Sequence, residues 1–159
     1  MATNLFAGTP LYEYCKRLVK IKERAVFDEV MSQKRITDLI IYLNTEDQLF
    51  KEGVDSQGNI IGTYSFATEF ITDGLKKAGD PFNLKDTGAY YESFRVRVKN
   101  GQITITADPI KTNEAGKTEN IYEKFGNFHI EGLTEQNLEV VRKFCLEYFQ
   151  NYYRKLLLK

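Results

Sequence analysis

Apolar and polar residues alternate on both sides of an Asn100-Gly101 pair in the second half of the chain. The apolar positions of this pattern are Phe94, Val96, Val98, Ile103, Ile105 and Ala107. A period of two is typical of strands with one buried face. Asn-Gly favours a two-residue turn, because that turn needs positive φ at both central residues. The pattern predicts a hairpin over 94–107. A short helix is expected before it, capped by Asp86 and Thr87, with Gly88 in the turn that leads into the helix.

A two-residue turn also fixes the register of the hairpin and assigns its two faces. Lys99 then lies opposite Gln102. The pairs expected on the core face are Val98 with Ile103, Val96 with Ile105 and Phe94 with Ala107. The other face carries Arg95, Arg97 and Lys99, which we call the basic stripe. We interpret the stripe as a solvated face, with contact to DNA or to an acidic neighbouring subunit as the alternative.

The end of the chain has the strongest helical periodicity. Apolar residues recur every three or four positions at Leu138, Val141, Cys145, Tyr148, Tyr152 and Leu156. Thr134 precedes them as an N-cap, so we expect a helix of about 23 residues. Its apolar stripe predicts that this helix packs on the sheet and covers the core face of the hairpin.

The first 52 residues also favour helices. Thr9-Pro10 is a cap followed by a proline suited to a first turn, and a loose apolar stripe extends from there to Val30 through about six turns. Lys22 interrupts the stripe, which predicts that part of this helix is exposed or rests on another subunit. A break is expected at 32–35. Residues 36–43 fit a helix or a strand, and we favour a helix.

Thr45-Glu46-Asp47-Gln48 resembles a capping box and predicts a separate short helix over 46–52 that Gly53 ends. Residues 54–59 form a turn, 60–65 a short extended piece, and 68–77 a weak helix that ends before Pro81. The polar segment 108–120 predicts a projecting, mobile loop. Residues 121–127 fit a strand or one helical turn that Gly126 ends.

The chain of 159 residues is long enough for one domain with its own core. We therefore predict a single α+β domain over 1–159, with a helical part at 1–52, a turn-rich part with the hairpin at 53–133, and a terminal helix at 134–159. Lys and Arg together number 22, as do Asp and Glu, so no global field attracts nucleic acid. The sequence has no signal-peptide pattern and no apolar run long enough to span a membrane, and we expect cytoplasmic synthesis.

Few residues suit catalysis or metal binding. His129 is the only histidine, and the two cysteines, Cys15 and Cys145, lie in predicted helices. We interpret both cysteines as reduced core residues, and His129 as structural or interfacial. Asp55-Ser56-Gln57-Gly58-Asn59 lacks the terminal glutamate of a calcium loop and is interpreted as a turn. The sequence therefore predicts no catalytic, cofactor or metal site, and a protein that is not an enzyme.

Several short motifs in the second two thirds of the chain follow one another in a recognisable order. They comprise an acidic turn with a glycine, a threonine, an L-x-x-T-G sequence with a later serine, a tyrosine and glycine, and a G-L-T turn before the last helix. The residues are Asp55, Gly58, Thr68, Leu84, Thr87, Gly88, Ser93, Tyr122, Gly126, Gly132 and Leu133. In this order they resemble the head-tail connector, neck and tail-completion proteins of tailed bacteriophages. Residues 86–90 are most similar to members from phages of Bacteroides-type gut bacteria.

The resemblance implies a structural virion protein that forms a homo-oligomeric ring in the neck or tail, around the channel through which DNA passes. Its partners would be portal, connector or tail proteins, with non-specific contact to passing DNA and no membrane. The candidate interface or channel residues are Arg95, Arg97, Lys99, Lys111 and Lys117. The alternative is a small DNA-binding or regulatory protein that uses the basic stripe. A small-ligand enzyme is a further class, which a pocket with convergent ionisable groups would distinguish.

Overall fold

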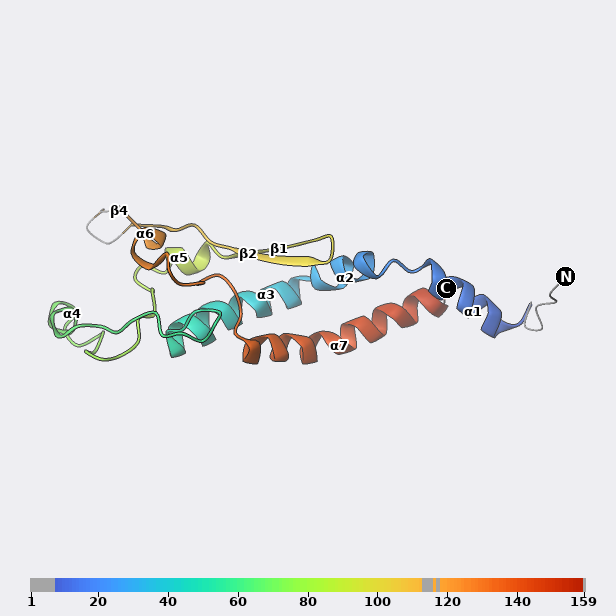
Figure 1. Ribbon diagram of the computed structural model, residues 1–159, viewed down its shortest axis with the longest axis horizontal. Helices are drawn as coiled ribbons and strands as arrows, with labels where there is room; N and C mark the ends of the chain where they lie inside the picture. Colours follow the sequence, from blue (N-terminus) through green and yellow to red (C-terminus); the bar gives the residue numbers. More distant parts are fainter. Residues whose placement is uncertain (1–7, 113–115, 117, 159) are drawn as a thin grey trace.

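The computed structural model describes residues 8–112, 116 and 118–158 of an elongated α+β protein. The helices are α1 Pro10–Lys20, α2 Glu23–Met31, α3 Lys34–Tyr42, the π-helix η1 Leu43–Glu52, α4 Phe66–Ile71, α5 Ala89–Glu92, α6 Ile121–Phe125 and α7 Glu135–Leu158. The strands are β1 Arg95–Lys99, β2 Gln102–Thr106, β3 Ile110–Thr112 and β4 Thr118–Asn120. In Figure 1 the middle of the molecule has three layers: the β1-β2 hairpin, the α2-α3 helices, and α7. The predicted α+β class is confirmed.

The β1-β2 hairpin has the predicted register. Val96 pairs with Ile105 and Lys99 with Gln102, so Asn100-Gly101 forms the turn, with positive φ at both residues. The Asp28 carboxylate of α2 accepts hydrogen bonds from the backbone N–H groups of Asn100, at 2.9 Å, and Gly101, at 2.8 Å. This contact between an acid and a distant turn fixes the hairpin on the helices and has no signature in the local sequence.

The prediction that the last helix covers the hairpin is wrong. The core face of β1 rests on α2 and α3, and α7 packs against the opposite side of these two helices (Figure 1). Periodicity shows that α7 has an apolar face, but not which of several apolar surfaces that face meets.

The N-terminal helices differ from the predicted single helix of about six turns. The chain is extended at Ile21 and Lys22, so α1 and α2 are separate, and Ile21 packs against the helical core. The break before α3 and the helical state of α3 are confirmed. No residue of α1 is buried, as its incomplete stripe predicted.

The capping box is also wrong. α3 continues without interruption into η1, and the Thr45 hydroxyl donates to the Ile41 carbonyl, 2.8 Å away, instead of capping a new helix. A threonine inside a helix satisfies its hydroxyl in this way, because the carbonyl four residues earlier lies within reach. Gly53 does end the helix, in the left-handed conformation with φ of 62°.

The projecting, mobile loop predicted over 108–120 includes 113–115 and 117, which lie outside the described residues. The described parts at 110–112 and 118–120 pair instead as the antiparallel strands β3 and β4, with Ile110 opposite Asn120 and Thr112 opposite Thr118. Tripeptide strands with few apolar residues carry too little periodicity to be recognised. In the segment that follows, the helical alternative for 121–127 holds, because α6 spans Ile121–Phe125.

Two apolar cores lie one after the other along the molecule. The first joins α2, α3 and α7 and contains Val26, Val30, Met31, Ile36, Ile40, Leu43, Leu133, Val141 and Cys145. The second lies beneath α5 and α6 and contains Leu49, Ile61, Leu84, Tyr90, Tyr91, Phe94, Ile121 and Ile130. The long α3-η1 helix contributes to both cores and so connects them.

Buried amides of the α3-η1 helix hold the segment that leads into α7. The Asn44 amide donates to the Ile130 carbonyl and accepts from Gly132 N, both at 3.0 Å. The Gln48 amide donates to the Gly132 carbonyl, at 2.9 Å, and accepts from Thr134 N, at 2.9 Å. These side chains satisfy backbone groups that would otherwise be buried without partners. They therefore fix where α7 begins.

We predict that Gln48→Leu lowers the free energy of unfolding by about 2 to 4 kcal/mol, because it leaves the Gly132 carbonyl and Thr134 N–H unpaired. Chemical denaturation of the two proteins measures the difference. Gln150→Leu, at an exposed position of α7, is the matched control and should change stability by less than about 0.5 kcal/mol. Equal losses for the two variants would contradict the role assigned to the Gln48 amide.

Candidate functional site

The acidic turn of the motif series is a structural element organised around the buried side chain of Asp55. Asp55 Oδ1 accepts from the backbone N–H groups of Gln57, at 3.0 Å, and Asn59, at 2.8 Å, while Oδ2 accepts from His129 N at 3.5 Å. Burial alone would raise the pKa of Asp55, but these hydrogen bonds outweigh it and hold the pKa below its usual value. Gly58 completes the turn with φ of 82°. The turn interpretation is confirmed.

The acidic turn meets the segment before α7. Ser56 N donates to the His129 carbonyl at 2.9 Å, and Gly132 lies so close that a Cβ there would be 2.8 Å from Ser56 Cβ. Leu133 is buried in the helical core. Motif residues from 55–58 and 132–133 are therefore brought together by packing.

The L-x-x-T-G residues shape the entry to the first hairpin. Gly88, with φ of 89°, is the residue immediately before α5, and the Thr87 hydroxyl accepts a hydrogen bond from the first backbone N–H of that helix. The Ser93 hydroxyl donates to the Tyr90 carbonyl at 2.6 Å and accepts from Asp108 N at 2.9 Å. This hydroxyl joins the end of α5 to the chain that leaves β2.

Tyr122 and Gly126 belong to a third structural contact. One oxygen of the Glu131 carboxylate accepts from the hydroxyls of Tyr90, at 2.7 Å, and Tyr122, at 2.6 Å. Burial, followed by these bonds to Glu131, raises the pKa of both tyrosines, so both stay protonated donors. Gly126 follows α6 where a Cβ would collide with the Tyr122 carbonyl. The motif residues of these three contacts thus position the backbone.

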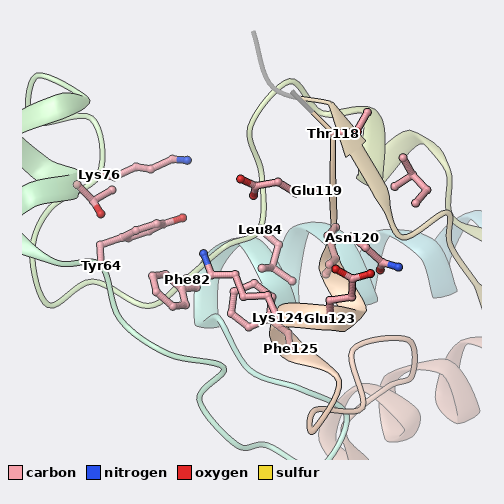
Figure 2. Close-up of a pocket in the computed structure, with 13 residues that line it drawn as sticks. Tyr64, Lys76, Phe82, Leu84, Thr118, Glu119, Asn120, Glu123, Lys124 and Phe125 are labelled. Atoms are coloured by element: carbon pink, nitrogen blue, oxygen red, sulfur yellow. The ribbon is translucent and has the colours of Figure 1, made fainter. Parts of the chain in front are cut away.

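A cleft of about 820 Å³ separates the α4 segment from β4 and α6 (Figure 2). Two motif residues, Thr68 and Leu84, are among the residues that line it. Lys76 and Glu119 extend toward each other from opposite walls, and Lys124 crosses the floor. The Tyr64 hydroxyl is already paired with Asn83, to which it donates at 2.8 Å and from which it accepts a backbone N–H at 3.2 Å.

This cleft can bind polar groups through its lysines and glutamates, which carry both signs of charge. Burial raises the pKa of Tyr64, so that its hydroxyl remains a hydrogen-bonding group. Lys76 and Lys124 bring positive charge into the cleft, and Glu119 and Glu123 bring negative charge.

The residues considered for chemistry lie apart. Cys145 is buried, and burial raises the pKa of its thiol. Cys15 is exposed on α1, so its interpretation as a core residue is wrong. His129 is engaged through its backbone. Within the described part of the chain, no group of three or more His, Cys, Asp or Glu side chains could hold a metal ion.

The basic stripe lies on the exposed face of β1, where Arg95, Arg97 and Lys99 occupy alternate positions along the strand. The Arg95 guanidinium donates to the carbonyls of Glu92, at 2.6 Å, and Phe94, at 2.7 Å. Lys111 belongs to the separate β3-β4 sheet, and Lys117 lies outside the described residues. Of the four candidate positions that the structure describes, three share one face of β1 and the fourth lies on a different sheet.

Sequence reasoning missed a group of strongly exposed apolar side chains near residue 70. Phe66, Phe70, Ile71 and Leu75, which we call the apolar knob, are 82%, 87%, 81% and 89% exposed. They lie on α4 and the turn after it, which project at one end of the molecule (Figure 1). Their spacing is weakly helical, which is typical of a helix with one buried face, so the sequence contains no signal that this apolar face stays uncovered.

A second apolar surface lies at the opposite end. Leu11, Leu18 and Val19 of α1 are exposed, and a groove of about 410 Å³ lies where α1, α2 and α7 meet. The groove is lined by Arg17, Lys20, Ile21, Lys22, Ala25, Val26, Tyr152 and Leu156. The Arg17 guanidinium donates to the Leu157 carbonyl at 2.6 Å and ties α1 to the end of α7.

Comparison of the chain with protein-family models, with curated proteins and with solved structures found no match. Among the residues that the structure describes, no helix is both long enough and apolar enough to cross a membrane.

We predict that Asp55→Asn destabilises the protein in a pH-dependent way. Because the folded pKa of Asp55 is lowered, its ionised form stabilises the fold above about pH 4, and this contribution is lost as the pH falls through the folded pKa. Denaturation should show a loss of about 1 to 3 kcal/mol at pH 7 that shrinks below pH 4. Asp38→Asn, in an exposed ion pair with Lys34, is the control and should have little effect. A loss independent of pH would contradict this account.

Proposed function

We propose that this chain is a structural protein of a tailed-phage virion, which forms a ring in the neck or tail around the DNA channel. The observation that carries the proposal is the apolar surface at both ends of an elongated subunit. Monomeric proteins rarely leave four neighbouring large apolar side chains more than four fifths exposed, and such patches mark interaction sites.

The position of the two surfaces also supports assembly of identical copies. A subunit with two different interaction surfaces at opposite ends makes head-to-tail contacts. These contacts form a closed ring when the rotation from each copy to the next adds up to a full turn. The rigid part between the ends is the three-layered middle of the molecule. Such a protein acts by geometry, since each copy holds its neighbours at a fixed angle.

The balance of 22 basic and 22 acidic residues fits a channel through which DNA slides without being gripped. The motif order that resembles connector and tail-completion proteins adds the location in the neck. Portal, connector or tail proteins are the neighbours implied by that location, and the chain is made in the host cytoplasm before it joins the particle.

Removing the gene from the phage that encodes it should yield DNA-filled heads without attached tails, because the joint between the two would be missing. Electron microscopy of the particles shows the outcome, and wild-type protein supplied in trans should restore tails. In particles made with the wild-type gene, mass spectrometry should find the chain in several copies. Normal tails in its absence, and its absence from purified particles, would contradict the proposal.

The second candidate function is a DNA-binding regulator. It is favoured by the basic stripe, which presents three cations along one exposed strand face. If the stripe binds duplex DNA, the isolated protein should bind with an affinity that falls steeply with salt, and replacing Arg95, Arg97 and Lys99 by serine should reduce the slope of log K against log salt by about 3. The ring proposal expects only weak binding that this triple substitution hardly changes. Fluorescence anisotropy over a salt series separates the two functions.

A further inference from the structure

The apolar knob is a protrusion and not part of a core. Its segment is held to the body by backbone hydrogen bonds, from Tyr64 N to the Asp80 carbonyl and from Gly79 N to the Tyr64 carbonyl, both at 2.9 Å. Tyr64 packs edge-on against Phe82, with ring centroids 4.9 Å apart. These contacts position the segment on its inner side and leave the four knob side chains facing solvent.

The groove at the other end is recessed, and part of its lining is apolar. Its apolar part includes Val26, Tyr152 and Leu156, which pack against or belong to the first core and so form a firm floor. Its volume of about 410 Å³ leaves room for a large side chain. A protruding apolar element and a recessed apolar surface are the two halves of an anchor-and-pocket contact.

Charges around the two surfaces are also complementary. Lys20 and Lys22 are exposed at the groove, and Asp73 is exposed within the knob segment, between Ile71 and Leu75. Of the lysines near the knob, Lys76 turns back over the Tyr64 ring, 5.4 Å from its centroid, and Lys77 remains exposed beyond the apolar set. An acid in the middle of the knob and two lysines at the groove favour one orientation of docking.

We propose that the apolar knob of one copy docks into the groove between α1, α2 and α7 of a second copy. Because knob and groove lie at opposite ends of the molecule (Figure 1), each copy uses one surface on each neighbour, which is a heterologous contact. The inference rests on the proposed function, since it specifies the contact from which the ring is built. Phe70 is the central anchor, and Asp73 meets Lys20 or Lys22.

The contact can be captured by mixing two singly substituted proteins, Leu75→Cys and Lys20→Cys, in a Cys15→Ser background, with an affinity tag on one of them. After mild oxidation, disulfide-linked heterodimers should form at least about tenfold faster than in a control mixture of Leu75→Cys with Thr104→Cys, because docking raises the effective concentration of the thiols. Thr104 is exposed on the outer face of the hairpin, away from the groove. Adding Phe70→Asp to the knob partner should reduce the rate to that of the control.

Circular dichroism checks that the variants are folded, which is expected because Leu75, Lys20, Phe70 and Thr104 are all exposed. Equal heterodimer rates in the two mixtures, or a rate that Phe70→Asp does not change, would overturn the knob-and-groove contact. The result is separable from the proposed function. If the chain is found in particles but this cross-link does not form, the virion role stands and the contact is rejected. If the cross-link forms specifically but the chain is absent from particles, the contact stands and the virion role is rejected.

Discussion

The arrangement of the molecule depends on the buried amides that the α3-η1 helix presents to the segment before α7. Asn44 and Gln48 each offer a donor and an acceptor, as a neighbouring strand would, and Asn137 adds a donor to the Leu43 carbonyl at 3.3 Å. A chain that crosses a protein interior must satisfy its backbone groups. Here side chains of a helix satisfy them, which lets the chain pass between the two cores and begin α7 at a defined place without a larger sheet.

Two cores in a row make the molecule long, and length determines what remains uncovered. In the middle, the α2-α3 layer is covered by the hairpin on one side and by α7 on the other, whereas α4 projects at one end without such cover. The α4 segment and α1 consequently bury little, and α4 has no fully buried residue. Apolar surface at such ends favours association, because burying it against another copy removes it from water. The elongated shape therefore leaves apolar surfaces at the two ends of the molecule that are suited to assembly.

The candidate site was only partly predictable. Asp55, Thr87 and Gly88 were predicted to form turns or caps, and they do so. The basic stripe followed from alternation and lies on one exposed face. The apolar knob was missed, since a weakly periodic apolar helix is read as buried unless its partner is known. The cleft was missed as well, because its walls come from segments far apart in the chain and only packing places them opposite each other.

The sequence by itself determined the elements whose signal is local and repeated. Alternation around Asn100-Gly101 predicted the register of the first hairpin, and three-to-four spacing after the Thr134 cap predicted the helix α7. Tertiary structure decided which surfaces meet: that α2 and α3 cover the hairpin, that Asp28 holds its turn, and that Thr45 lies inside a continuous helix. These outcomes depend on contacts between residues far apart in the sequence. The same apolar faces could pack in several ways, and the packing with the lowest free energy forms. Local periodicity shows that a face is apolar but not which packing is lowest in free energy.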